Sequence, residues 1–295
     1  MKIIVLGAGA IGSLYGAKLS ELNDITLVGR QQHADEINKQ GLKIIGLEEN
    51  TYKIKAITKV EKIEENTLIL LTTKVYDSEN AIMHIKNLIK KDTIILCLQN
   101  GLDSENIVKK IVGKKCIVLR GITNVGASFL KPGTVQYNSV SYTAIEKSEK
   151  SAVSDELASM FKKCGLNGYV SEDIKKDSWK KLILNCVLNP VSAILKVENR
   201  VIADKKLDTL KKLIIEECLK VAEKDNINFD IDFVKSINEA LKDSKNISSM
   251  QQDILKGKHT EIDYLNGAVV SLGKKYGIEC KVNEALVNMI KFLES

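Results

Sequence analysis

Hydrophobic residues in the first 170 positions come in short, almost uninterrupted runs. These runs lie at 2–6, 24–28, 67–73, 93–98 and 116–123. Runs that are apolar throughout are typical of strands covered on both faces of a parallel sheet. Shorter segments at 43–45 and 52–57 predict strands of a small antiparallel excursion. Segments 134–137 and 141–145 predict a closing hairpin. A helix is expected at 154–164, followed by a last strand at 168–170. We therefore predict an α/β domain over residues 1–170.

Beyond residue 171 the hydrophobic spacing changes to the three- and four-residue periodicity of amphipathic helices. Helices are expected at 174–195, 206–225, 230–243, 249–256, 261–276 and 282–293, with breaks such as Asn226 and Gly277 between them. No segment in this half carries a convincing strand pattern. We predict that residues 171–295 form a second, all-helical domain.

The first predicted strand leads directly into a glycine-rich turn and then into a helical pattern. The turn consists of Gly7, Ala8, Gly9, Ala10, Ile11 and Gly12, a G-x-G-x-x-G sequence. In this setting the first glycine permits a tight turn, the second lets the backbone approach a pyrophosphate, and the third lets the helix pack closely on the strand. The helix N-terminus then faces the anion. These features predict a Rossmann-type dinucleotide-binding domain.

The residue after the second strand indicates which dinucleotide is held. An acidic residue there would bond the ribose 2′-hydroxyl of NAD and repel a 2′-phosphate. Here the strand is followed by Gly29 and Arg30, and the next acid is Asp35. Because a guanidinium forms two charge-assisted hydrogen bonds with a phosphate, we predict NADPH rather than NADH. The alternative is that Arg30 is an ordinary solvated charge.

Two further residues stand where open α/β sheets bind ligands. Lys74 follows the strand at 67–73, and Asn100 follows the strand at 93–98. The carboxyl ends of parallel strands form the edge at which such sheets hold their ligands. This position favours a functional role for both residues, although Asn100 and Gly101 on their own would be an ordinary turn.

The first helix of the second half carries a polar stripe beside a buried face. Lys181, Asn185 and Asn189 recur every four residues. Their apolar neighbours are Trp179, Leu182, Ile183, Cys186 and Val187. Burying one ammonium and two amides at the edge of a core costs free energy unless they find hydrogen-bond partners, and a bound polar ligand could provide them. The alternative is that the lysine extends to solvent and the asparagines bond neighbouring helices. Pro190 is expected to kink the helix beyond Asn189 and free a carbonyl.

Length, composition and charge narrow the class of protein. The 295 residues suit two domains, and 44% hydrophobic with 28% charged residues is typical of globular proteins. No segment resembles a signal peptide or reaches the roughly 18 apolar residues that span a bilayer, so we expect a cytoplasmic protein without membrane contact. A net charge of +6 from scattered lysines, with 5% aromatic residues, argues against nucleic-acid binding. The six cysteines and three histidines show no metal-ligand spacing, so no metal is expected.

Several motifs occur together in an order that resembles the ketopantoate reductases, the 2-dehydropantoate 2-reductase family. They are GAGAIG at the N-terminus, TTK ending at Lys74, QNG around Asn100, WKKLILNCVLNP around Lys181, NISSMQQD around Ser249 and HTEIDYLNG around Glu261. The likeness spans almost the whole chain, and the combination of NCxxNP, SSMxQD and EIDYxNG is highly specific. It implies a Rossmann domain followed by an all-helical domain of the 6-phosphogluconate dehydrogenase type, with the active site in the cleft between them.

The resemblance also implies an activity and a role for each matching residue. Family members reduce ketopantoate to (R)-pantoate with NADPH, in the pathway to pantothenate and coenzyme A, and are monomers or homodimers. By resemblance, Lys181 is the proton donor. The substrate is held by Asn185, Asn189, Asn199 and Ser249. The cofactor is contacted by Lys74, Ala127 and Glu261, and Asn100 reaches both substrate and cofactor. One departure is that Arg200 follows Asn199 where the family has a glycine.

Two other functions are consistent with the same residues. One is an NADPH-dependent reductase of another 2-keto acid, since the motifs do not specify the pocket for the substrate's gem-dimethyl group. The other is a protein that senses NADPH without turnover. The presence of Lys181 beside Asn185 and Asn189 disfavours this second alternative.

Overall fold

The computed structural model describes residues 1–149 and 151–295. The chain forms two compact units. The first comprises Met1–Gln99 with Asp103–Ile174, and the second comprises Asn100–Leu102 with Lys175–Ser295. The short segment Asn100–Leu102 therefore belongs to the helical unit, although the strand before it and the helix after it belong to the first.

The first unit is built on an eight-stranded sheet. Its strands are β1 (Lys2–Leu6), β2 (Asp24–Val28), β5 (Lys55–Ile57), β6 (Thr67–Leu71), β7 (Ile94–Cys97), β8 (Ile117–Thr123), β11 (Thr143–Ile145) and β12 (Gly168–Val170). Their order is β12-β11-β8-β7-β6-β1-β2-β5, and the strands from β8 to β5 are all parallel. β11 runs antiparallel to β8 and parallel to β12. Because the strand order reverses between β1 and β6, this is a doubly wound sheet, and the predicted Rossmann-type fold is confirmed.

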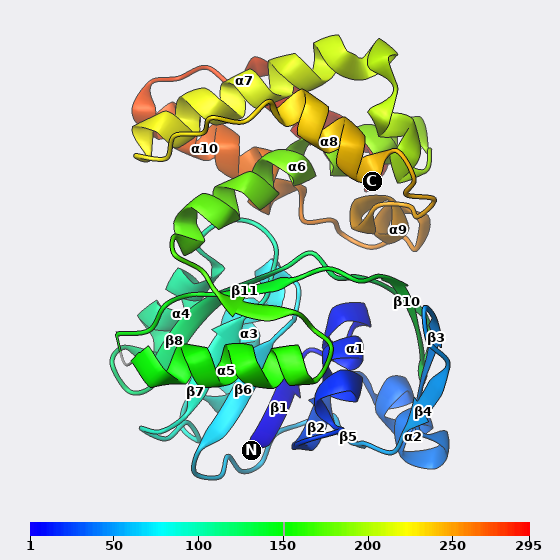
Figure 1. Cartoon of the computed structure of the whole chain (residues 1–295), viewed down its shortest axis with the longest axis vertical. Helices are drawn as coiled ribbons and strands as arrows, with labels where there is room; N and C mark the ends of the chain where they lie inside the picture. The colour runs from blue at the N-terminus through cyan, green and yellow to red at the C-terminus, as the bar shows by residue number, and fades with distance from the viewer. Residues whose placement is uncertain (150) are drawn as a thin grey trace. The chain divides into compact units, whose positions relative to one another are not determined.

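Helices cover both faces of this sheet, which explains the uninterrupted apolar runs. They are α1 (Ala10–Leu19), α2 (Gln31–Gln40), η1 (Val75–Asp77), α3 (Ser78–Ile85), α4 (Ser104–Val112) and α5 (Ser151–Lys163). Along β1, Ile3 and Val5 join the core that holds residues of α1 and α5, whereas Ile4 and Leu6 join the core with residues of α3 and α4. Figure 1 shows α5 in front of the sheet and α3 and α4 behind it. Since side chains alternate across a strand, a strand covered on both faces is apolar at every position.

A second, four-stranded sheet packs against α1 in the same unit. It consists of β4 (Asn50–Tyr52), β3 (Leu42–Gly46), β10 (Thr134–Ser139) and β9 (Gly126–Lys131), in that order. Two expectations were wrong here. The predicted strand 52–57 is split, because β5 leaves the excursion and pairs with β2 of the main sheet. Segment 134–137 pairs with the unpredicted β9, and β11 pairs with β8 instead of closing a hairpin. Apolar runs identify short strands but do not specify their partners.

The second unit is helical throughout its described residues. Its helices are α6 (Ile174–Leu195), η2 (Asn199–Ala203), η3 (Lys205–Leu207), α7 (Asp208–Lys224), α8 (Phe233–Leu241), α9 (Ser249–Leu255), η4 (Ile262–Tyr264), α10 (Asn266–Tyr276) and α11 (Lys281–Leu293). Residues of α6, α7, α8, α10 and α11 form one core, in which Trp179 is fully buried and donates its indole N–H to Asp225 at 2.9 Å. No helix among the described residues of the chain is long and apolar enough to cross a membrane.

Helix α6 continues through Pro190 and ends at Leu195. A proline lacks the N–H that would bond the carbonyl four residues earlier. That carbonyl belongs to Cys186, and the side-chain amide of Asn266 donates to it at 3.0 Å. The carbonyl freed by Pro190 is thus used inside the core, and the expected kink beyond Asn189 stays a prediction.

Candidate functional site

The glycine-rich loop of the first unit is held rigidly at the point where the strand order reverses. The N–H groups of Gly7 and Ala8 both donate to the Val28 carbonyl, at 3.1 and 2.8 Å, and Thr72 Oγ1 donates to the Gly7 carbonyl at 2.9 Å. Gly7 has a φ of +113°, and a Cβ on it would lie 2.5 Å from the backbone nitrogen of Thr73. Only glycine fits there, as the sequence pattern requires.

Gly9 leaves an open space at the start of α1. It is the N-cap residue, no side chain caps the helix, and the first turn contains no acid. The leading N–H groups and the positive end of the helix dipole are therefore not neutralised by the helix itself. A Cβ at Gly9 would meet no heavy atom within 4 Å. An anion could approach the backbone at this point, so the loop fits the pyrophosphate of a dinucleotide.

Arg30 stands beside this loop. It is the N-cap residue of α2 and its side chain is exposed. Neighbouring Gly29 packs on the loop, since a Cβ there would lie 3.1 Å from the Cβ of Ala8. Within the described part of the chain the guanidinium makes no ion pair or hydrogen bond, and Asp35 accepts a bond from Gln31 at 2.7 Å. A guanidinium without a competing carboxylate fits a 2′-phosphate.

His33, which the sequence analysis did not single out, connects the helix of Arg30 to that of the loop. Its ring is 3% exposed; Nδ1 accepts from the Gly133 N–H at 2.9 Å, which leaves a proton on Nε2, 3.0 Å from the Ser13 hydroxyl. Burial lowers the pKa of His33 and so favours the neutral ring that these two bonds require. Because Ser13 lies on α1, the ring ties α2 to the helix that starts at Gly9.

Lys74 lies at the carboxyl end of β6, as predicted, and is the half-buried N-cap residue of η1. Its carbonyl accepts from the Asp77 N–H at 3.0 Å and from the Ser78 hydroxyl at 3.3 Å. Gln99, at the end of β7, is buried and donates to that same hydroxyl at 2.7 Å. Gln99 therefore supports the turn that carries Lys74. The sequence analysis did not single out Gln99, although its position just after strand β7 could have indicated a role at this edge of the sheet. Ala127, on β9, packs against the core of the same unit.

The stripe on α6 has the predicted arrangement. Lys181, Asn185 and Asn189 all lie within this single helix, and the five apolar neighbours named above are buried. Lys181 and Asn185 are half-buried, and Asn189 is 4% exposed. In the described structure the side-chain amides of Asn185 and Asn189 have no hydrogen-bond partner. Amides at the edge of a core without protein partners are available to a polar ligand.

Two adjacent serines at the start of α9 have different environments. Ser248 is buried, caps the helix by accepting from the Gln251 N–H at 3.2 Å, and lies 2.8 Å from the Ser192 hydroxyl. Ser249, the predicted substrate residue, is the first residue of the helix and is exposed. The structure thus uses Ser248 for capping and leaves Ser249 to solvent.

Asn199 lies at the start of η2 and is buried. Its N–H donates to the Asn246 carbonyl at 2.8 Å, and its Nδ2 is 3.5 Å from the Ser244 hydroxyl. Asn199 therefore contacts the segment that leads into α9. Its Oδ1 is buried and has no hydrogen-bond partner within the described residues.

Asn100 and Glu261 meet within the second unit. Asn100 Nδ2 donates to Glu261 Oε2 at 3.1 Å, and the Glu261 side chain is buried. Leu102, two residues further on, packs against the helical core. The structure therefore brings together two predicted site residues that are 161 positions apart in the sequence.

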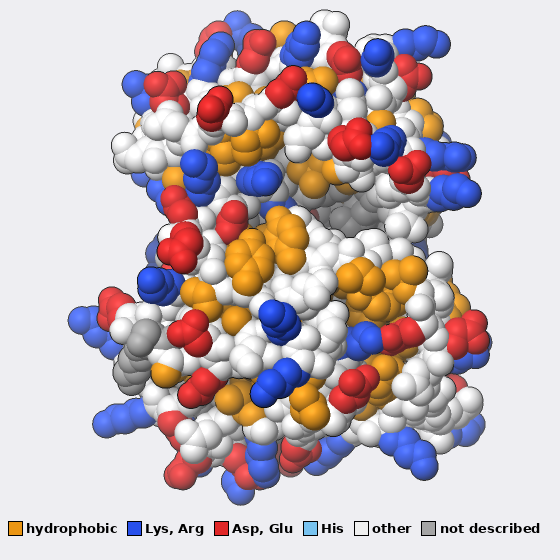
Figure 2. Space-filling model, in the orientation of Figure 1, with side chains coloured by type: hydrophobic (Ala, Val, Ile, Leu, Met, Phe, Trp, Pro, Cys, Tyr) orange, Lys and Arg blue, Asp and Glu red, His pale blue; other side chains and the backbone are white. Residues whose placement is uncertain are grey.

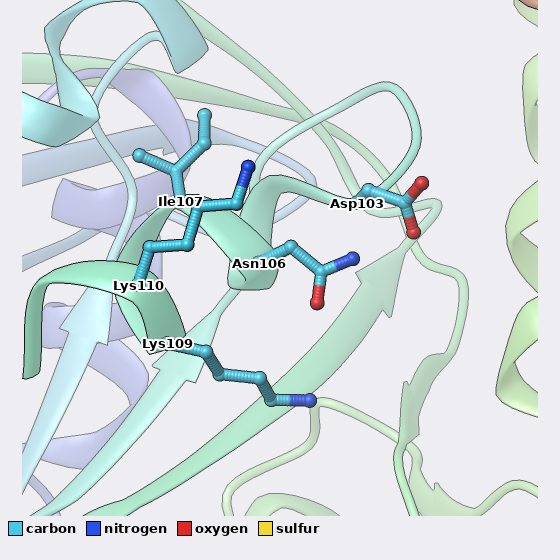
Figure 3. Close-up of a pocket in the computed structure, with 5 residues that line it drawn as sticks. All are labelled: Asp103, Asn106, Ile107, Lys109 and Lys110. Atoms are coloured by element: carbon cyan, nitrogen blue, oxygen red, sulfur yellow. The ribbon is translucent and has the colours of Figure 1, made fainter. Parts of the chain in front are cut away.

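One surface hollow among the described residues lies apart from the predicted site residues. Figure 3 shows a hollow on the outer side of α4, lined by Asp103, Asn106, Ile107, Lys109 and Lys110, none of which is a predicted site residue. On the face shown in Figure 2, Lys and Arg side chains are interspersed with Asp and Glu side chains. Among the described residues no group of three or more His, Cys, Asp or Glu side chains could hold a metal ion.

Known proteins resemble this chain along its whole length. Residues 3–150 match the family model of ketopantoate reductase PanE/ApbA, and residues 173–294 match that of its C-terminal region. The 2-dehydropantoate 2-reductase of Pyrococcus horikoshii is 37% identical, with 100% of this chain and 98% of that protein covered. A solved ternary structure of D-mandelate dehydrogenase with NADH and anilino(oxo)acetate is 30% identical, with a TM-score of 0.92 over 100% of this chain and 98% of that one.

A third relative is the PanE/ApbA family ketopantoate reductase of Ralstonia eutropha, whose crystal structure is 27% identical, with a TM-score of 0.90 over 100% of this chain and 98% of that one. One family model matches most of the Rossmann-type unit, and the other matches nearly all of the helical unit. The glycine loop, the lysine-asparagine stripe and these full-length matches lead to one assignment: the chain belongs to the ketopantoate reductase PanE/ApbA family.

Proposed function

We propose that this protein is a 2-dehydropantoate 2-reductase that reduces ketopantoate to (R)-pantoate with NADPH. The observation that carries the proposal is the stripe on α6. There the Lys181 ammonium lies beside two side-chain amides that have no hydrogen-bond partner within the described residues, at the edge of a core. Such groups match the oxygens of a 2-keto acid in number and polarity. Full-length relatives named 2-dehydropantoate 2-reductase support the same activity.

Lys181 is assigned the role of proton donor. When bound, NADPH supplies the hydride that reduces the carbonyl carbon. Reduction leaves negative charge on the carbonyl oxygen, and a positioned ammonium stabilises this charge before it gives up its proton. The positive charge of Lys181 also attracts the substrate carboxylate. Asn185 and Asn189 bind substrate oxygens without competing for the proton, because an amide does not ionise. Asn199 and Ser249 are assigned to substrate on the resemblance.

The glycine loop and several further residues are assigned to the cofactor. Gly7 to Gly12 would hold the pyrophosphate and Arg30 the 2′-phosphate. The other assigned residues are Lys74, Asn100, Ala127 and Glu261. Glu261 accepts a hydrogen bond from Asn100, so these two act together, and Asn100 is assigned to substrate as well. Gln99 supports Lys74 through Ser78.

A second candidate is the reduction of a different 2-keto acid. The likeness to D-mandelate dehydrogenase with NADH, at 30% identity and a TM-score of 0.92, favours an aromatic substrate and NADH. Arg30 favours NADPH, because a guanidinium gains nothing from a cofactor that lacks the 2′-phosphate. The proposed partner is in either case a small keto acid; a cytoplasmic location and a monomeric or homodimeric state are also proposed.

A steady-state assay that follows the absorbance of reduced nicotinamide tests the proposal. Ketopantoate, 2-ketoisovalerate and phenylglyoxylate are compared, each with NADPH and with NADH. Ketopantoate with NADPH should give the highest kcat/KM. Faster reduction of phenylglyoxylate would assign the second candidate, and NADPH binding without turnover of any keto acid would assign a sensing role.

A further inference from the structure

Pro190 leaves one carbonyl of α6 without its helical donor, and a side chain from another helix replaces that donor. The carbonyl belongs to Cys186, which is 0% exposed. Asn266, the first residue of α10 and also fully buried, donates its Nδ2–H to this carbonyl at 3.0 Å. Because a buried carbonyl without a donor costs free energy, Asn266 takes the place of the missing backbone N–H.

The orientation of the Asn266 amide is fixed by a second acceptor. Its Nδ2 also donates to Asn283 Oδ1 at 2.9 Å, and Asn283 Nδ2 donates to Glu217 Oε2 at 2.7 Å. The Glu217 carboxylate accepts further bonds from the backbone N–H groups of Val282 and Asn283, both at 2.9 Å. Since an ionised carboxylate only accepts, the donor and acceptor ends of both amides are determined.

The buried Asn266 side chain costs free energy, so its amide must do more than fill space. Asn266 Oδ1 is buried and has no hydrogen-bond partner within the described residues. A leucine would occupy a similar volume without an unbonded oxygen, and would be the cheaper residue if no carbonyl required a donor. The Cys186 carbonyl that Pro190 leaves open therefore accounts for the amide.

We propose that Asn266 is a positioning residue for the substrate stripe. The Cys186 carbonyl lies in the helical turn that separates Asn185 from Asn189, so the bond it accepts sets the spacing of these two amides. Asn266 is fully buried and acts through α6. The inference rests on the proposed function, because that function assigns Asn185 and Asn189 to the substrate.

The test removes the side-chain donor and then restores a donor from the backbone. Asn266→Leu should raise the KM for ketopantoate about tenfold, the equivalent of one lost hydrogen bond, and leave the KM for NADPH within about twofold. Pro190→Ala supplies an N–H at position 190, so in Asn266→Leu/Pro190→Ala the helix itself bonds the Cys186 carbonyl. The double variant should recover most of the lost affinity for ketopantoate.

Asn238→Leu is the matched control. It makes the same chemical change in the same unit, at a residue that bonds Asp208 and Lys211 and not Cys186. Pro190→Ala should not compensate for it. Thermal unfolding of every variant corrects activity for the folded fraction. If Asn266→Leu reduces only the active fraction without changing the ratio of the two KM values, the residue is merely structural and the inference is overturned.

Two further outcomes are decisive. If Asn266→Leu does not fold, folding of the double variant is the expected rescue, and a double variant that also fails to fold overturns the inference. The free energy of unfolding is measured for the wild type, Asn266→Leu, Pro190→Ala and the double variant. If the effects of the two substitutions on this free energy are simply additive, the inference is overturned even when the enzyme is active. A wild-type protein that reduces no ketopantoate but shows this coupling refutes the proposed function alone.

Discussion

The helical unit contains two pairs of asparagines whose surroundings differ in kind. Asn266 and Asn283 are fully buried, and their amide nitrogens donate to protein acceptors at distances between 2.7 and 3.4 Å. Asn185 and Asn189 border the same core, yet neither amide has a partner within the described residues. The first pair joins helices to one another, whereas the second pair is left to water or a ligand. The same residue type thus has two functions that only its partners distinguish.

Two lysines of the same unit differ in burial and in their surroundings. Lys211 is 1% exposed, and its ammonium donates to the Ile202 carbonyl at 2.9 Å, to the Asp208 carboxylate at 2.8 Å and to Asn238. Lys181 is half-buried and shares its helix face with the two unbonded amides. Removal of such a buried ammonium would leave its acceptors without a donor, which strongly destabilises a fold. In the proposed function, the ammonium beside these amides stabilises charge that develops on the ligand.

Exchanging the two lysines for methionine should give the largest effects. Lys181→Met removes the proposed proton donor and should lower kcat of the folded protein about 100- to 10,000-fold. Lys211→Met leaves a buried carbonyl and a carboxylate without their donor and should cost about 3 kcal/mol of stability, with near-normal kcat for the folded protein. Steady-state kinetics and denaturant unfolding measure both. Full activity in Lys181→Met would remove this residue from the mechanism.

The asparagine pairs should respond in opposite ways. Asn283→Ala breaks the network to Glu217 and should lower the free energy of unfolding by about 3 kcal/mol. Asn189→Ala should change that free energy by less than about 1 kcal/mol, because no protein bond is lost, while raising the KM for ketopantoate about tenfold. The comparison fails if Asn189→Ala proves as destabilising as Asn283→Ala.

In the first unit, Arg30 resembles Asn185 and Asn189, because its guanidinium also has no hydrogen-bond or ion-pair partner in the described chain. Arg30→Ala should weaken NADPH binding by about 1.5 to 3 kcal/mol, as for a hydrogen bond to a charged group, and leave NADH binding almost unchanged. Titration of both cofactors against wild type and variant measures the difference. Equal weakening of the two would contradict the assignment of Arg30 to the 2′-phosphate.

Substitution of His33 should give the smallest effect, a change in how the free energy of unfolding depends on pH. Burial lowers its pKa in the folded state, so below the usual value near 6.5 the unfolded chain binds a proton that the folded chain does not. His33 should therefore make stability fall with decreasing pH, by at most about 1.4 kcal/mol per pH unit, until the pKa of the folded state is reached. Denaturant unfolding between pH 7 and 5 should show a shallower slope in His33→Gln. An unchanged slope would refute the effect.

The sequence alone predicted those features that depend on local spacing. The strand at Lys2–Leu6, the glycine turn after it and the single helix that carries Lys181, Asn185 and Asn189 each follow from a pattern within a few residues. Alternate placement of Ile3 and Ile4 on opposite faces follows from strand geometry in the same way.

Features that depend on long-range partners were not predicted. The pairing of β5 with β2 was missed, because a three-residue strand carries too little pattern to select its neighbour. The six-residue strand β9 was not predicted at all, so its pairing with β10 was missed as well. His33, Gln99 and Asn266 were missed for a similar reason. Each acts through bonds to distant segments, as from Asn266 to Cys186 across 80 positions. Residue type and local spacing do not specify the partners of such bonds, although the place of Gln99 after a strand gave a local signal for that residue.

The most direct measurement is a crystal structure of the protein with NADP and pantoate bound. The account predicts that the Lys181 ammonium and the amides of Asn185 and Asn189 lie within about 3.2 Å of pantoate oxygens, the upper range of a good hydrogen bond. It also predicts that Asn266 still donates to Cys186. Pantoate bound elsewhere, with these amides facing only water, would contradict the central claim.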